Sequence, residues 1–78
     1  MYIIKFIKLP QTYEMLIFDD LLRLLAEHRS EDLSEMNFYI QTTQKKFEFK
    51  DVLLIIHDKI NNSVDLKRID GDVFLANY

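Results

Sequence analysis

The distribution of apolar and polar positions predicts seven short elements along the chain. Residues 2–9, YIIKFIKL, are apolar on both faces of an extended strand, which is typical of a central or doubly covered strand, and Pro10 ends it. Residues 12–29 carry apolar positions at helical spacing, with Thr12 as a candidate N-cap, and predict the principal helix. Residues 30–36 combine serines with acids, which favours a short connecting turn of helix.

The second half of the chain predicts two hairpins and a further helix. Residues 37–50 alternate apolar and polar positions around a polar turn, which favours a half-exposed antiparallel hairpin. Residues 51–62 are bracketed by capping residues and favour a helix, although their run VLLII also fits a buried strand. Residues 64–69 and 73–77 predict a closing hairpin around Asp70–Gly71, which places the only glycine where a positive φ is needed.

The resulting order, β-α-β-β-α-β-β, predicts the α+β class. We expect residues 1–78 to form a single compact two-layer domain, with a mostly antiparallel sheet and helices packed on one face. A core of this size supplies little stability without disulfides or a metal. Association into a homo-oligomer is therefore as compatible with the sequence as a monomer.

Composition narrows the class of protein. The chain has 49% apolar and 13% aromatic residues, which excludes a disordered chain. It has no cysteine, which excludes a disulfide scaffold, a zinc finger and a thiol nucleophile. A net charge of -3 gives no overall attraction for nucleic acid or anionic membranes. Without a recognisable signal segment or a long apolar run, we expect a cytoplasmic protein with no membrane association.

No constellation of residues predicts catalysis, a metal or a cofactor. His28 and His57 lack further ligands at metal-binding spacing, and Asp70–Gly71–Asp72 lacks the other oxygen ligands of a calcium loop. The serines lie outside any glycine-flanked elbow, and a single glycine cannot build a phosphate-cradling loop. We therefore expect a protein that is not an enzyme and holds no cofactor.

Two sets of residues are candidates for binding another protein. Charge is segregated along the chain, since residues 11–40 hold seven acids and two arginines, and an acidic surface would steer a basic partner. The acidic candidates are Glu27, Glu31, Asp32 and Glu35. The apolar candidates form one row of the unusually wide stripe on the predicted helix: Met15, Phe18, Leu22 and Leu25. Their ordinary interpretations are a solvated acidic face and a deeply packed helix.

The predicted hairpin at residues 43–50 supports a different function. It interleaves lysines and aromatics, as in surfaces that stack bases beside a phosphate track. Its candidate nucleic-acid-binding residues are Lys45, Lys46, Phe47, Phe49 and Lys50. The ordinary interpretation is two core phenylalanines with the lysines in water.

We expect a small non-enzymatic protein that binds another protein with a basic surface and regulates or inhibits it. Residues with AT-rich codons are abundant, which favours a phage or mobile-element origin, with action in the host cytoplasm. The alternatives are a nucleic-acid or small-ligand binding module built on residues 43–50, and a structural oligomer subunit.

Overall fold

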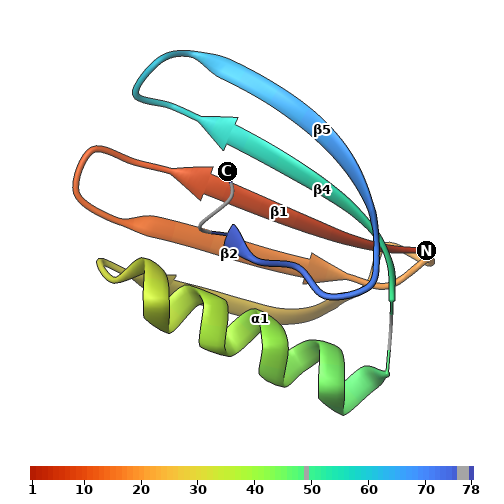
Figure 1. Ribbon diagram of the computed structural model, residues 1–78. Helices are drawn as coiled ribbons and strands as arrows, with labels where there is room; N and C mark the ends of the chain where they lie inside the picture. Colours follow the sequence, from red (N-terminus) through yellow and green to blue (C-terminus); the bar gives the residue numbers. More distant parts are fainter. Residues whose placement is uncertain (49, 76–77) are drawn as a thin grey trace.

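Five strands form one sheet, and a single helix packs against it in the part of the chain that the structure describes (Figure 1). The computed structural model describes residues 1–48, 50–75 and 78. In chain order the elements are β1 (Tyr2–Lys8), β2 (Tyr13–Phe18), β3 (Leu24–Ser30), α1 (Leu33–Phe47), β4 (Asp51–Asp58) and β5 (Ser63–Asp70).

The sheet is mixed, with strand order β3-β2-β1-β4-β5. Three neighbouring pairs are antiparallel, whereas β1 and β4 run parallel at the centre. The connection between them passes through β2, β3 and α1, and α1 carries the chain from β3 at the edge across to β4. Two parallel neighbours need such a long connection, because the chain must return to the end of the sheet at which the first strand began, and a tight turn cannot do this. The α+β class, the mostly antiparallel sheet and the central position of the first strand are confirmed.

The hydrophobic core lies between α1 and one face of the sheet. Alternate residues of β1, β2 and β4 point into it, as the two-residue period of a strand requires. Large side chains buried in this way stabilise the fold by about 1.5–3 kcal/mol each. The core residues are Ile4, Phe6, Met15, Ile17, Met36, Ile40, Val52, Leu54, Ile56, Val73 and Leu75.

The prediction of a hairpin at residues 37–50 is wrong, because the helix α1 takes its place. The carboxylate of Asp32 accepts a hydrogen bond from the Ser34 amide at 2.9 Å and caps the N-terminus of the helix. Met36, Ile40 and Gln44 then recur every four residues and form its buried stripe. The same segment also alternates in polarity, so the period of two competes with the helical period, and packing decides between them.

The principal helix predicted for residues 12–29 is also wrong, because this segment forms the hairpin β2–β3. The apolar residues of this segment fit both the helical period and the two-residue period of a strand. Met15 and Ile17 enter the core, whereas Leu16 lies on the opposite face of the sheet. Asp19 and Arg23 form an ion pair at 2.7 Å across the turn between the two strands.

The predicted helix at residues 51–62 and the predicted closing hairpin also differ from the structure. Residues 51–62 were favoured as a helix, but the alternative strand is correct and forms β4. The closing hairpin around Asp70–Gly71 is wrong, because β5 pairs with β4 through a turn in which Asp58 accepts amide hydrogen bonds from Ile60 and Asn61. The positive φ expected of Gly71 is confirmed at 113°, and it directs the chain off the sheet edge onto the core.

The C-terminal segment lies across the core beside α1, on the viewer's side of the strands in Figure 1. The amide of Gln44 donates to the Gly71 carbonyl and accepts from the Val73 amide, both at 3.0 Å. About two turns earlier in the helix, the side-chain oxygen of Asn37 accepts from the Leu75 amide at 2.5 Å. Side chains of α1 therefore supply the hydrogen bonds that a neighbouring strand would otherwise provide.

We expect Gln44→Met to lower the free energy of unfolding by about 2 kcal/mol, because it leaves a buried amide and a carbonyl without partners. Urea unfolding measures this change. Gln41→Met, at an exposed position of the same helix, is the matched control and should unfold like the wild type. Equal unfolding midpoints for the two variants would show that Gln44 does not hold the segment.

Candidate functional site

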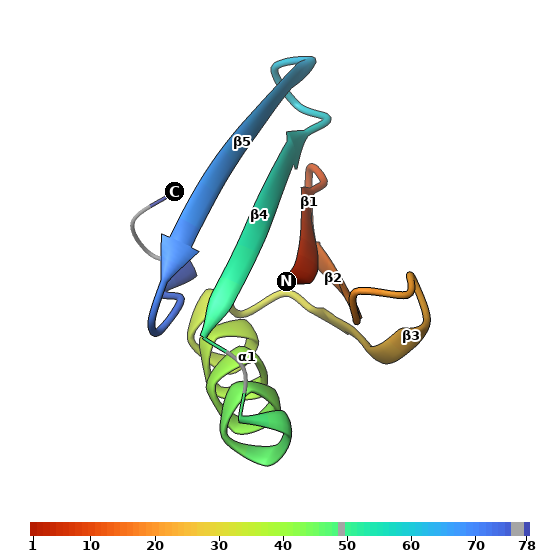
Figure 2. The same ribbon diagram turned by 90° about the vertical axis from the view of Figure 1, so that its right-hand side faces the viewer.

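The face of the sheet opposite α1 is apolar and carries no covering element among the described residues (Figure 2). Its residues alternate with the core residues along each strand, so the strand register places them together. We call this surface the open face. Its central members are Ile3, Lys5, Ile7, Leu16, Phe18, Leu53, Ile55, His57, Val64 and Leu66.

Lys5 stands at the centre of the open face. Its direct neighbours across the sheet are Leu16 on β2 and Ile55 on β4. The same row continues to Glu27 at one edge and Leu66 at the other. Glu27 is two strands away, or about 10 Å. Lys5 is half-buried as a residue and forms no ion pair with any described residue.

Two ion pairs within the chain lie at the rim of the open face. Arg29 on β3 forms an ion pair with Glu14 on β2. At the opposite edge, Arg68 on β5 lies 3.2 Å from the carboxylate of Asp51 on β4. An apolar patch surrounded by polar groups is typical of a surface that contacts a partner. Because these two pairs lie at the rim, Lys5 is the charge that a partner meets at the centre of the open face.

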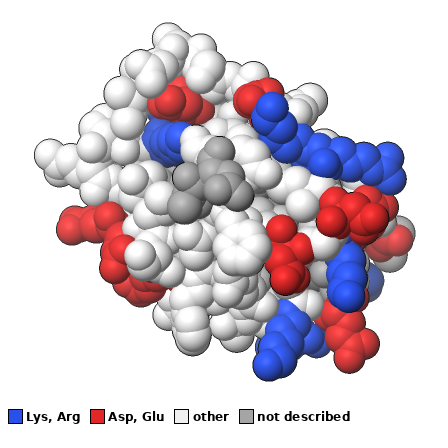
Figure 3. Space-filling view, viewed as in Figure 1, with Lys and Arg blue, Asp and Glu red and all other residues white. Residues whose placement is uncertain are grey.

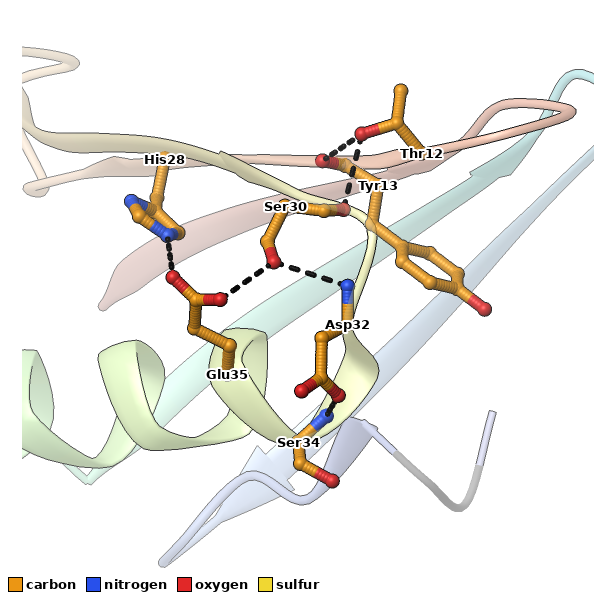
Figure 4. Close-up of polar contacts among 7 residues, drawn as sticks. All are labelled: Thr12, Tyr13, His28, Ser30, Asp32, Ser34 and Glu35. Carbon is orange, nitrogen blue, oxygen red and sulfur yellow. Dashed lines mark hydrogen bonds and ion pairs between the residues drawn. The ribbon is translucent and has the colours of Figure 1, made fainter.

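The four acidic candidates do not form one surface. Glu27 is exposed on β3, at the edge of the open face, and Glu31 is exposed in the turn that precedes α1. Asp32 and Glu35 instead cap and brace the start of α1 (Figure 4). These last two carboxylates therefore already have partners in the fold.

The brace around Glu35 connects α1 to the end of β3. The Ser30 hydroxyl donates to Glu35 Oε2 at 3.0 Å and accepts from the Asp32 amide at 3.0 Å (Figure 4). The other oxygen, Oε1, lies 3.5 Å from the buried Nε2 of His28. The imidazole of His28 also contacts the ring of Tyr39, with centroids 3.5 Å apart and the two planes tilted by 34°. This cluster positions the helix on the sheet and is built from contacts within the chain.

The apolar candidates do not share one face either, because the helix that would align them is absent. Met15 is 1% exposed in the core, and Leu25 packs against the core from β3. Phe18 lies on the open face, opposite Leu24. Leu22 is 69% exposed at the tip of the β2–β3 loop, in the left-handed conformation. Phe18 is thus the member of this predicted row that the structure places on the open face.

The basic candidates lie at the end of α1, since the hairpin at 43–50 does not form. Lys45 and Lys46 are exposed, Phe47 packs against the core, and Phe49 lies outside the described residues. Lys50 precedes β4 and lines a hollow of about 690 Å³ together with residues of both charges. The charged and polar residues lining it are Lys45, Lys50, Glu48, Asp72, Gln41 and Gln44.

Acidic and basic side chains both line this hollow. Charges of both signs are likewise interspersed on the right-hand side of the view in Figure 3. A phosphate track needs several cations without intervening carboxylates. The described residues also contain no group of three or more His, Asp or Glu placed to hold a metal ion. The arrangement therefore favours contact through the open face over chemistry at the end of α1.

None of the protein-family models, curated proteins or solved structures compared with this chain matches it. No helix among the described residues has the length and apolar character required to cross a bilayer.

Sequence reasoning missed the open face, although a signal for it was present. Residues 2–9 are apolar on both faces, and this was interpreted as a strand that is central or covered twice. The strand is central, but its second face is left uncovered by the described residues. Leu16 and Ile55 were not proposed as partners of Lys5, because residues 12–29 and 51–62 were assigned to helices.

The loop at one end of the open face is organised by Asp19. Its Oδ1 accepts from the amides of Leu21 and Arg23 at 2.9 Å, and its Oδ2 accepts from the Arg23 guanidinium at 2.7 Å. The hydrogen bond from the Arg23 amide is the main reason that the pKa of Asp19 lies below its ordinary value of 3.8, although burial acts to raise it. The ionised carboxylate holds the loop that displays Leu21 and Leu22, both 69% exposed.

We expect Asp19→Asn to be less stable than the wild type near neutral pH, with a difference that shrinks as the pH falls. A folded-state pKa below the unfolded one gives stability that is present above about pH 4 and is lost as the pH drops through the folded pKa. Urea unfolding at a series of acidic pH values measures it. Asp20→Asn, an exposed neighbour, is the control. A constant difference across the series would contradict the role of Asp19 ionisation.

Proposed function

We propose that this chain is a non-enzymatic protein-binding module that regulates or inhibits its partner, and that the open face is the binding surface. One observation carries the proposal: the second face of the sheet is apolar, no described element covers it, and its central lysine forms no ion pair with a described residue. A second layer usually covers such a face in a small α+β domain. A partner surface supplies that layer here.

The partner surface that fits best is apolar with a carboxylate near its middle. Apolar contact with Leu16 and Ile55 would supply most of the affinity, since burial of apolar surface drives association. A carboxylate placed over Lys5 would keep the lysine paired once water is removed, and would fix the orientation of the complex. A partner without that acid would leave a buried, uncompensated charge, which is costly.

The basic partner expected from the sequence stays a prediction for the exposed acids Glu27 and Glu31, which lie beside the open face and before α1. A basic rim on the partner would complement them and speed association without adding much affinity. Action in the cytoplasm and a phage or mobile-element origin likewise stay predictions.

The test places a photo-crosslinking residue at Leu16 on the open face or at Phe38, an exposed position of α1, and exposes each protein to an extract of its native cells. We expect one protein of defined mass to be captured from position 16 and not from position 38. Lys5→Glu should reduce this capture about tenfold through loss of the central ion pair, whereas Lys46→Glu at the end of α1 should not.

Equal capture from both positions, or capture unchanged by Lys5→Glu, would contradict the proposal. Capture that nuclease treatment abolishes and Lys45→Glu weakens would instead support the nucleic-acid alternative.

A further inference from the structure

The two edges of the sheet differ in a way that concerns β5. At the β3 edge, a register irregularity follows Ile17, and α1 packs against the strand through Tyr39 and Glu35. Both features are ordinary means of protecting an edge. The edge strand β5 pairs with β4 over eight residues without irregularity. Its segment 63–68 is exposed at every position.

The backbone groups that β5 presents outward can be identified from the ladder. The Gly71 amide donates to the Lys50 carbonyl at 2.7 Å, so these opposed residues form a hydrogen-bonded pair. Such pairs alternate along an antiparallel ladder. Val64, Leu66 and Arg68 therefore turn their N–H and C=O groups away from β4. The Leu66 amide agrees, because it donates to its neighbouring Asp65 side chain at 3.0 Å.

We propose that β5 pairs antiparallel with β5 of a second copy, about a two-fold axis at Leu66. A two-fold axis perpendicular to the sheet keeps the faces matched, so that Leu66 lies opposite Leu66 and Asp65 lies opposite Lys67 of the second copy. Val64 lies opposite Arg68. The outward N–H and C=O groups of these alternate residues then hydrogen-bond across the axis, and the two sheets become one.

The charges select this register over its neighbours. With the axis at Asp65 or at Lys67, that residue would face its own copy, and like charges directly opposite are destabilising. With the axis at Leu66, two Asp65–Lys67 pairs flank it. These fall in non-hydrogen-bonded positions, where opposing Cα atoms are only about 4.5 Å apart. The edge is thus complementary to itself in one register.

The side chains required for these pairs are accessible in the single chain. Lys67 and Asp65 already lie 3.5 Å apart on the same side of β5, with side chains 48% and 60% exposed. An exposed pair of this kind contributes little on its own, so exchanging it for a pair across the axis costs little. Leu66 and Val64, 60% and 63% exposed, gain apolar cover at the same time.

Pairing through β5 goes beyond the proposed function and does not depend on it. The two open faces would point the same way and join at the two Leu66 side chains. One edge pairing buries less than the roughly 1,600 Å² of a standard interface, so the dimer should be weak. It should form as the protein concentration rises from micromolar to millimolar.

Sedimentation velocity of the purified chain over that concentration range tests the pairing by charge exchange. Asp65→Lys would place two lysines opposite each other, and Lys67→Asp would place two aspartates opposite each other. We expect each variant to dimerise about tenfold more weakly than the wild type. The double variant, and an equimolar mixture of the two single variants, should both regain dimerisation, because opposite charges then face each other again.

Circular dichroism establishes that each variant is folded, and Leu16→Glu tests the open face separately. A wild type that stays monomeric would overturn the proposal. So would a dimer that is insensitive to both single variants, or one that Leu16→Glu abolishes, since this would place the contact on the open face. The first two outcomes leave capture of a different protein by Lys5 and its neighbours untouched, whereas the third would place a second copy on the same face.

Discussion

The parallel pairing of β1 with β4 is the constraint on which the rest of the structure depends. It requires that the chain return across the sheet, and α1 supplies this crossover from β3 to β4, so the helix lies over one face of the sheet. The core then forms between that face, α1 and residues 73–75, which Gln44 and Asn37 hold in place. The described residues contain one helix, and none of their elements covers the second face of the sheet.

This asymmetry connects the two proposals. A sheet with one covered face keeps apolar side chains such as Leu16 and Ile55 at the surface around Lys5, which favours a partner that acts as the missing layer. The helix also braces β3 through His28 and Glu35, whereas β5 at the far edge receives no such support. The open face provides apolar area for binding, whereas the β5 edge provides backbone hydrogen bonds. The two surfaces therefore select partners through different interactions.

The fold class could be predicted because it depends on composition and on the number of apolar segments. The central strand at residues 2–9 was identified since its two apolar faces fit only an interior position. The sequence predicts a helix for residues 12–29, which form strands, and a hairpin for residues 37–50, most of which belong to the helix α1. Both segments fit the helical period and the strand period equally well. The open face depended on these assignments, so it could not be found from the sequence alone.

The α+β class, the lack of cysteine and the positive φ at Gly71 all follow from the sequence. Each of these depends on residues close together in the chain. Tertiary structure decided which segments became strands, which face was covered, and that Lys5 would lie between Leu16 and Ile55. The reason is that local propensities here are nearly balanced, and pairing between distant segments contributes the larger free energy.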